Sequence, residues 1–530
     1  MRRMKGAAGL LTALLLAFQL SAQTFALANE DNGIKVVPVN FTHNGYSYEI
    51  EGVAKSTDGD YQIKSPARLA ARKLPSTYDP RSSGEITTVK DQASTGACWA
   101  FSALACAEQD LIKKGLENPS AEFSVPALVL SSNSGTATGK DDFSSGGNWL
   151  FAASALANGQ GLCYEDYEPF LESGTENMIV SENKKSVSEY RLNYVMELSS
   201  TTQVKRKIME LGAVSASYFA GNGYMNHNNT AYYDPDASKN TIINHSVTVV
   251  GWDDNYSKDN FRYKPANNGA WLVKGSWGAD QDNDGFYWVS YDEAEFGQFC
   301  CYDFEESCDN TYHYSKMTGY VVNASNDGSV YGANVFTAKA DEKLDKAGFM
   351  YVGKTGSADY TLSVYTNVSD SDPIGVLETQ ISGSVSANGF YTVDFPEDIL
   401  LEEGEKYSIS VKFSGDSGRG YLLAESDRTS KVQSGQSYVS LNGKYWFDVG
   451  ADKTDSIGSL FIYAYTDELQ SPIKVHLKPP LRSTAPLQAV KEKQTTPERC
   501  LQMKLLPRTI SQTHKSSLSP PQKNRTKPLL

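Results

Sequence analysis

One cysteine opens an apolar, alanine-rich run and is a candidate nucleophile. Cys98 begins the block Cys98-Trp99-Ala100-Phe101-Ser102, and the pattern predicts a helix over residues 99–114 that ends at Gly115. A helix N-terminus favours an anion, so a thiol at this position ionises and attacks more readily than an ordinary cysteine. We expect Cys106, on the same helix, to be a buried structural thiol.

A thiol nucleophile needs a base, and the chain has only six histidines. His245 stands just before the apolar run Val247–Trp252, which is typical of a buried strand. A lone histidine before a strand is more often structural than functional. The assignment of His245 as the base therefore depends on further motifs.

Five short blocks follow one another between Leu74 and Tyr291. They are Leu74-Pro75-Ser76-Thr77-Tyr78-Asp79, Gln92 with Cys98–Ser102, Ser145-Gly146-Gly147, Asn244-His245 with Val249-Val250-Gly251-Trp252, and Lys274-Gly275-Ser276-Trp277-Gly278. Their order and composition resemble the papain family of cysteine peptidases. In that family the histidine follows the cysteine by about 130–150 residues, and His245 follows Cys98 by 147.

The resemblance assigns a role to each block. It implies that Cys98 attacks a peptide carbonyl and that His245 takes the thiol proton, while the Gln92 side-chain amide and the Cys98 backbone N–H hold the oxyanion. It also implies that Gly146 and Gly147 bind the substrate as an extended strand. Trp277 would cover the histidine from solvent.

Three positions depart from the family pattern. Gly275 stands where the family has the asparagine that orients the histidine, and Asn267 or Asn268 is the candidate substitute. Losing one neutral hydrogen bond costs about 0.5–1.5 kcal/mol, so we expect a slower enzyme rather than an inactive one. Thr95 removes half of a disulfide common in the family, and Gln281 replaces a frequent second tryptophan.

Two rival functions remain open at this point. Gly275 favours a catalytically impaired papain-like envelope protein that binds peptides or glycans. The second rival is a cell-wall amidase of the related Cys-His superfamily, which would release stem peptides from peptidoglycan. The block from Gln92 to Ser102 favours the peptidase.

The ends of the chain predict where the protein works. A basic leader, an apolar core and Ala26-Leu27-Ala28 predict a signal peptide over residues 1–28, too short in its apolar part to span a membrane. Residues 29–73 form a short propeptide or N-terminal extension. We expect a secreted or envelope-associated extracellular protein, without a membrane span after signal removal.

The remaining residues predict an α+β papain-like catalytic domain over residues 74–302, with a helical subdomain before a β-rich one. An all-β sandwich follows over 303–468. Alternating strands over 360–364 and 407–413, with Asn442-Gly443 as a two-residue hairpin turn, resemble the lectin-like domain of some bacterial papain-type peptidases. Residues 469–530 are basic, proline-rich and without aromatic residues, so we expect a disordered tail.

The composition of the chain restricts the classes of molecule that we expect the protein to bind. The net charge is −14. Residues 471–530 hold 12 Lys and Arg against 2 Asp and Glu, so the rest of the chain is strongly acidic and nucleic acid is not expected as a partner. We expect a protein or peptide substrate, with a cell-wall glycan or polymer held by the sandwich and the tail. No cofactor and no metal are predicted: Asp280–Gly285 imitates the start of a calcium loop, but Tyr291 stands where a bidentate Glu is required.

Overall fold

The computed structural model describes two hairpin strands near the N-terminus and most of residues 73–469. The described ranges are 35–43, 46–54, 73–132, 143–144, 146–159, 162–166, 169–170, 189–221, 223–237, 242–279, 284–316, 320–325, 328–369, 371–425, 432–451 and 458–469. The described residues all fall within one compact unit. The predicted signal peptide and basic tail lie outside the described residues.

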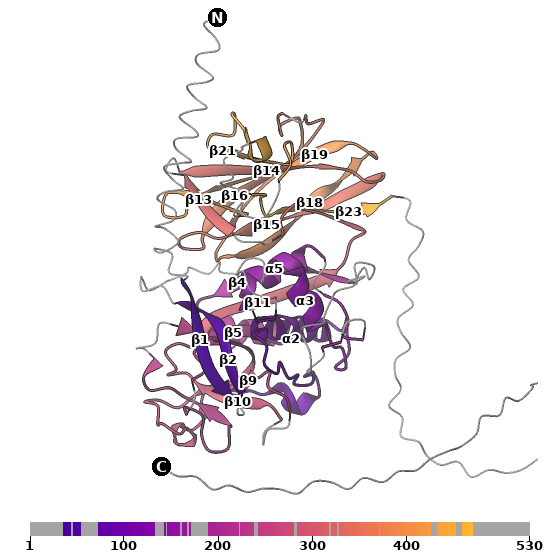
Figure 1. Cartoon of the computed structure of the whole chain (residues 1–530). Coiled ribbons are helices and arrows are strands. Elements are labelled where there is room, and N and C mark those ends of the chain that lie inside the picture. Colours follow the sequence, from indigo (N-terminus) through magenta and orange to yellow (C-terminus); the bar gives the residue numbers. More distant parts are fainter. Residues whose placement is uncertain are drawn as a thin grey trace, which may run out of the picture. The chain divides into compact units, whose positions relative to one another are not determined.

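The helices lie in the first half of the chain, as predicted. They are α2 (Cys98–Lys113), α3 (Val125–Ser131), α5 (Trp149–Ala157) and α6 (Thr201–Leu211), with short 3-10 turns η1 (Pro80–Ser83), η4 (Lys258–Asn260) and η5 (Val449–Ala451). Ser124, Asn148 and Ser200 cap α3, α5 and α6 by accepting a backbone N–H. Figure 1 shows α2 between α5 and the strand β9.

Strands dominate the part that follows. They are β3 (Thr77–Tyr78), β4 (Tyr190–Leu198), β5 (Val214–Tyr218), β6 (Ala231–Tyr232), β8 (His245–Asp253), β9 (Ala270–Lys274), β10 (Phe286–Ser290) and β11 (Gly297–Glu306). Apart from β3, which pairs with β8, these strands form the run β4-β11-β5-β8-β9-β10-β6 within a twelve-stranded sheet. The strand predicted for the apolar run 247–252 is confirmed by β8, and the papain-like α+β fold is confirmed with it.

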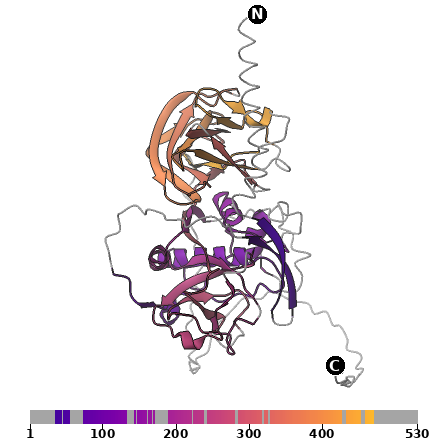
Figure 2. The same ribbon diagram turned by 90° about the vertical axis from the view of Figure 1, so that its left-hand side faces the viewer.

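The C-terminal part is all-β, as predicted. Its strands are β12 (Asn310–Tyr312), β13 (Tyr320–Ser325), β14 (Ser329–Thr337), β15 (Glu342–Tyr351), β16 (Ala358–Thr366), β17 (Val376–Val385), β18 (Gly389–Leu401), β19 (Lys406–Ser414), β20 (Gly420–Glu425), β21 (Ser437–Ser440), β22 (Phe447–Asp448) and β23 (Ile462–Glu468). Two layers of strands face each other, drawn mainly in orange in Figure 2. Phe349 of β15 packs between Tyr360 and Phe413 of the other layer at ring distances of 5.0 and 5.2 Å.

The large sheet runs through both parts of the chain. Residues Gly389 and Phe390 of β18 pair with Met196 and Val195 of β4, so the order β12-β23-β15-β18 continues directly into β4-β11. Residue 302, the predicted end of the catalytic domain, lies within β11.

Two features differ from the predicted pattern. The N-terminal extension has no clear period in sequence, yet it contains the hairpin β1 (Lys35–His43) and β2 (Tyr46–Ala54), and β2 pairs with β7 (Ile242–Ile243). The prediction of a two-residue turn at Asn442-Gly443 is wrong, because the loop that joins β21 to β22 is longer and spans residues 441–446. In that loop the Asn442 side chain accepts the backbone N–H groups of Lys444 and Tyr445.

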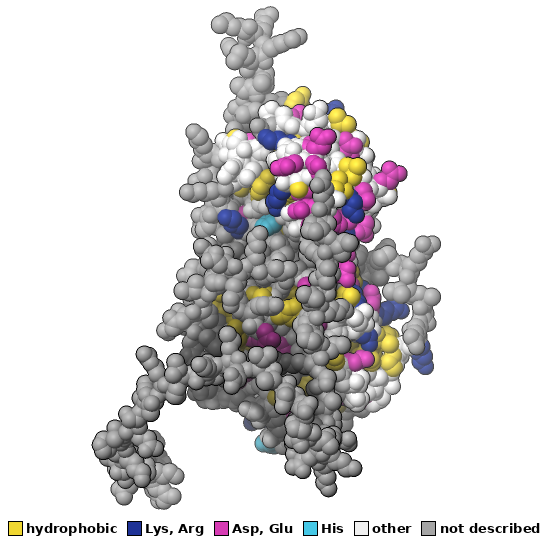
Figure 3. Space-filling view, turned by 90° about the vertical axis from the view of Figure 1, so that its right-hand side faces the viewer, with side chains coloured by type: hydrophobic (Ala, Val, Ile, Leu, Met, Phe, Trp, Pro, Cys, Tyr) yellow, Lys and Arg dark blue, Asp and Glu magenta, His cyan; other side chains and the backbone are white. Residues whose placement is uncertain are grey.

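The surface agrees with the acidic composition. On the face shown in Figure 3, acidic side chains are spread over the described residues with basic ones between them, in line with the net charge of −14. Among the described residues, no helix is long and apolar enough to cross a membrane.

Candidate active site

The candidate nucleophile lies at the first residue of α2. Ala97 is the N-cap of this helix and offers no side-chain cap, so the positive end of the helix dipole acts on Cys98. Burial raises the pKa of the Cys98 thiol, whereas hydrogen bonds from Ser246 and from the backbone of Trp99 and Cys98 oppose the rise. A thiol in this setting ionises efficiently only if a nearby base takes its proton.

The candidate base lies at the start of β8, on the strand against which α2 packs. The Ser102 hydroxyl, one turn after Cys98, donates to the carbonyl of Val247 at 2.7 Å. This bond holds the first turn of α2 along β8, and Ser246 contacts the thiol from the position next to His245. Cys98 and His245 therefore lie in one buried region, 6% and 1% exposed, although 147 residues separate them in sequence.

Aromatic rings enclose the imidazole on two sides. The Trp277 indole stacks on the His245 ring with 4.3 Å between centroids and 8° between planes. The Tyr218 ring meets the imidazole edge-on at 5.9 Å. The indole fixes the plane of the imidazole and shields it from solvent.

Gln92 is held from both ends of its side-chain amide. Its Nε2 donates to the Thr95 carbonyl at 2.7 Å, and its Oε1 accepts from the Ser276 hydroxyl at 2.6 Å. The Gln92 backbone N–H also donates to the Ser276 carbonyl at 2.7 Å. Because the Thr95 carbonyl can only accept, it fixes which end of the amide is the nitrogen, and the second Nε2 hydrogen remains as a donor. The sequence offered no sign of this role for Ser276.

The predicted substrate wall lies against the residue that follows the nucleophile. Gly146 and Gly147 precede α5, whose N-cap Asn148 accepts the backbone N–H of Leu150 at 2.9 Å. A Cβ on Gly147 would lie 2.4 Å from the Trp99 ring. Only glycine permits this approach, so the wall and the nucleophile share one packing surface. Ser145 lies outside the described residues.

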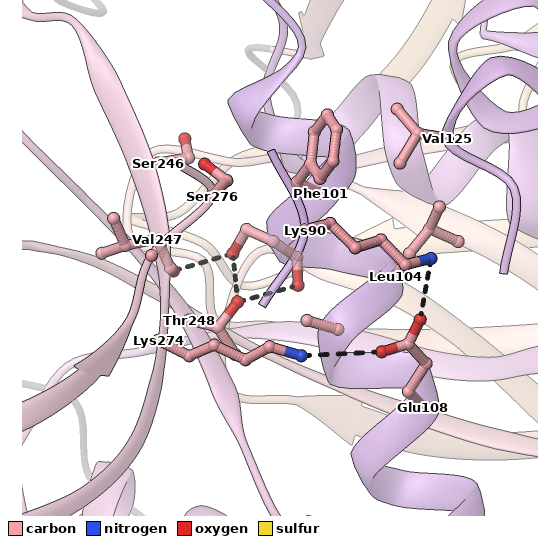
Figure 4. A pocket seen from close by; sticks show the side chains of 13 residues that line it. Lys90, Phe101, Leu104, Glu108, Val125, Ser246, Val247, Thr248, Lys274 and Ser276 are labelled. Carbon is pink, nitrogen blue, oxygen red and sulfur yellow. Dashed lines mark hydrogen bonds and ion pairs between the residues drawn. The ribbon is translucent and has the colours of Figure 1, made fainter. Parts of the chain in front are cut away.

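A buried charge cluster supports α2 behind the nucleophile. Figure 4 shows Glu108 of α2 between Lys90 and Lys274, with N–O distances of 3.4 and 3.7 Å. Glu108 and Lys274 are 2% and 4% exposed, and Thr87 donates to Glu108 Oε2 at 2.6 Å. Burial lowers the pKa of Lys274, and the Glu108 carboxylate opposes this shift. The cluster cross-links α2 to β9, and its pairing is not evident from the sequence.

The prediction that Asn267 or Asn268 orients His245 in place of the missing asparagine is wrong. Asn267 and Asn268 are exposed, whereas His245 is buried. The Asn267 side chain donates to Asp292 at 3.1 Å, and the Asn268 side chain accepts the backbone N–H of Lys258 at 3.2 Å. Both asparagines serve the surface loops near η4.

No metal or disulfide adds to the site among the described residues. They contain no group of three or more His, Cys, Asp or Glu side chains placed to hold a metal ion. No disulfide joins the six described cysteines. Residues 280–283 of the calcium-like loop and Cys500 lie outside the described part of the chain.

Two family models match the chain. Residues 74–326 match the papain family of cysteine proteases, and residues 311–466 match a lectin-like domain. Curated relatives match over the first of these regions: cathepsin K of Mus musculus is 24% identical over 216 residues, and cathepsin L2 of Homo sapiens is 26% identical over 224. These matches cover 40% and 42% of this chain. They span 59% and 62% of the two cathepsins, less than two thirds of either.

Solved structures match over both parts. The clostridial cysteine protease Cwp84 after propeptide cleavage is 28% identical with a TM-score of 0.65, covering 74% of this chain and 99% of that one. A structure of the cysteine protease and lectin-like domains of Cwp84, a surface layer associated protein of Clostridium difficile, is 26% identical with a TM-score of 0.64. That match covers 77% of this chain and 91% of the Cwp84 chain.

Proposed function

Since the chain combines a domain of the papain family of cysteine proteases with a lectin-like domain, we propose that it is an exported cysteine endopeptidase. The observation that carries the proposal is the position of Cys98 at the start of α2, beside the residue that follows His245. A thiol, an imidazole and a fixed amide donor in one buried region are the groups that thiol-dependent acyl transfer needs.

The proposed reaction has two stages. His245 takes the Cys98 proton, and the thiolate forms a bond to the carbonyl carbon of the substrate peptide. The oxyanion accepts hydrogen bonds from Gln92 Nε2 and from the Cys98 backbone N–H. The C–N bond then breaks as the imidazolium gives its proton to the leaving amine. Water adds to the thioester, releases the acid and restores the thiol.

Gly146 and Gly147 complete the proposed site. Backbone groups of glycine can approach an extended peptide closely, since there is no side chain to hold it away. The close approach of Gly147 to the Trp99 ring, next to Cys98 in the chain, supports this position of the wall. The substrate would therefore lie between this wall and Trp277.

A mechanism-based epoxide that alkylates active-site thiols tests the assignment. We expect one label per wild-type chain, located on Cys98 by peptide mass mapping, and no label in Cys98→Ala. Cys106→Ala is the matched control, since Cys106 lies on the same helix and is fully buried. An unlabelled wild type, or a label retained in Cys98→Ala, contradicts the proposal.

The two rival functions are separable by substrate. The similarity to cathepsins and to a clostridial cysteine protease does not favour the impaired binding protein. An endopeptidase cleaves casein and a fluorogenic peptide amide, whereas a cell-wall amidase releases stem peptides from peptidoglycan. Release of stem peptides without cleavage of casein would replace the peptidase proposal with the amidase.

We further propose an extracellular, envelope-associated location in which the lectin-like part holds a cell-wall glycan or polymer. The surface-layer association of Cwp84 supports it, together with the predicted signal over residues 1–28 and the basic composition of residues 469–530. Cosedimentation of Cys98→Ala chains with purified cell walls is the test. A chain ending at residue 468 should retain the glycan-dependent part of binding and lose the salt-sensitive part.

Residues 29–73 are proposed to be a propeptide. The hairpin β1–β2 pairs through Val53 with Ile243, two residues before His245. A segment bound at this position has to leave or move before an extended substrate reaches the histidine. N-terminal sequencing of the secreted mature protein tests this, with a new terminus near Leu74 as the expected result.

A further inference from the structure

Two tyrosines share the face of the sheet that carries His245. Tyr218 of β5 is the direct cross-strand partner of His245 on β8, and residues directly opposite in a sheet point to the same side. Tyr287 of β10 is the partner of Val273, which itself pairs with Val249 of β8. The Tyr218 and Tyr287 hydroxyls are hydrogen bonded to each other at 2.9 Å.

Tyr287 occupies the space beside the position of the missing asparagine. A Cβ built on Gly275 would lie 3.4 Å from Cε1 of Tyr287, in ordinary van der Waals contact. The Gly275 backbone N–H donates to the Gly285 carbonyl at 3.1 Å, which fixes β9 and β10 at this point. The tyrosine ring therefore lies next to the volume that an asparagine side chain at residue 275 would enter.

The hydroxyl pair lies deep in the protein. Tyr218 and Tyr287 are 1% and 4% exposed, and burial is the main cause that raises the pKa of each phenol. Both hydroxyls are therefore protonated at neutral pH. The charge of Cys98 acts on Tyr287 and raises its pKa further, so the hydroxyl pair and the thiol share one poorly screened region.

We propose that the Tyr287 hydroxyl, held by Tyr218, replaces the missing asparagine as the group that orients the His245 imidazole. This inference rests on the proposed function, in which His245 is the base. The imidazole N–H would donate to Tyr287 Oη, while one of the two phenol hydroxyls donates to the other. Both tyrosines are positioning residues, since they act on the substrate only through His245.

A hydroxyl suits this role because it accepts a hydrogen bond and carries no charge. An accepted bond stabilises the imidazolium that forms when the Cys98 proton is transferred. The stacked indole of Trp277 fixes the plane of the ring, so the hydroxyl has only to select the rotation within that plane. The rings that contact His245 are Tyr218 from β5 and Trp277, and the titratable groups Cys98 of α2 and Tyr287 of β10 lie buried in the same region.

The test is the pH profile of Tyr287→Phe, which removes one oxygen and keeps the ring. We expect kcat/KM to fall by about ten- to a hundredfold, the range of a hydrogen bond to a charged group, with the loss in kcat rather than KM. The alkaline limb of the profile should move down by about one pH unit, because the imidazolium loses its acceptor. Tyr218→Phe should shift the limb in the same direction by less.

Tyr232→Phe is the matched control. Its ring packs edge-on against Tyr218, it is 2% exposed, and its hydroxyl donates to the Phe219 carbonyl at 2.6 Å. The Tyr232→Phe variant loses an equally buried hydroxyl but is unchanged near Gly275. The acid and alkaline limbs of its pH profile should therefore match those of the wild type. Folded Tyr287→Phe with wild-type limbs, or an equal shift in Tyr232→Phe, overturns the proposal.

Epoxide labelling of Cys98 separates this result from a failure of the proposed function. If the wild type is labelled and Tyr287→Phe keeps its pH profile, only the positioning role is lost. An unlabelled wild type removes both proposals. Circular dichroism and thermal melts of each variant verify that the compared proteins are folded.

Discussion

Replacement of Gln92 by alanine tests the geometry of the oxyanion donor. The side chain is 2% exposed and fixed through Thr95 and Ser276. Gln92→Ala removes the Nε2 donor and leaves the Ser276 hydroxyl without its acceptor. It leaves the thiol and imidazole in place, because α2 is held to β8 through Ser102.

The expected loss of activity follows from the stage of the reaction at which the Gln92 side-chain amide acts. One oxyanion-hole donor is worth about 10²–10³ in kcat, because it acts on charge that exists only in the transition state. The Cys98 backbone N–H remains as the second donor, so activity should be reduced and not abolished. Loss of the buried bonds should lower the free energy of unfolding by about 1–3 kcal/mol.

Steady-state cleavage of a fluorogenic peptide amide gives kcat and KM separately. We expect the loss to appear in kcat, with KM nearly unchanged. Gln92→Glu is the second variant: it keeps the acceptor for Ser276 but brings negative charge to the oxyanion, so it should be at least as slow. Ser94→Ala, at an exposed neighbouring residue, should behave as wild type. A kcat for Gln92→Ala within threefold of wild type (about 0.7 kcal/mol) would refute the oxyanion role.

Three further perturbations follow from the same geometry. Gly147→Ala should abolish most activity and cost about 1–3 kcal/mol in chemical unfolding, because its Cβ would lie 2.4 Å from the Trp99 ring. Glu108→Gln should cost about 3–5 kcal/mol in urea unfolding, because it leaves Lys274 buried without its carboxylate. Burial raises the pKa of Glu293 to about 7, above its unfolded value, so its protonated form stabilises the folded state at low pH. That contribution is lost as pH rises through 7, so Glu293→Gln should raise the free energy of unfolding more at pH 8 than at pH 5, by at most about 3 kcal/mol.

The local pattern predicted the elements that hold the proposed site. The alanine-rich run after Cys98 predicted α2, and Gly115, with φ of 72°, ends that region in the left-handed conformation expected of a C-terminal glycine. The apolar run Val247–Trp252 predicted β8. These signals are readable because each depends on neighbouring residues, and the candidate nucleophile and base stand at the ends of the elements concerned.

Contacts between distant residues could not be read in the same way. The tie between Gln92 and Ser276 joins residues 184 apart, and the bond between the two tyrosine hydroxyls joins residues 69 apart. Neither bond has a spacing rule, since each joins segments that meet only in the folded chain. The choice of Asn267 and Asn268 as partners of His245 failed for this reason: chain proximity to Gly275 does not place a side chain on the buried face.

The absence of a clear boundary between the two parts also has a physical cause. β18 of the lectin-like part pairs with β4, and the Glu197 side chain of β4 accepts hydrogen bonds from Trp149 at 2.9 Å and from Asn388 at 3.1 Å. Trp149 begins α5, two residues after Gly147 of the proposed substrate wall. The lectin-like part thus completes the packing beneath that wall as well as adding a surface of its own. A domain that contributes strand pairing and hydrogen bonds to its neighbour leaves no exposed polar linker, and such a linker is the feature by which a boundary is recognised in sequence.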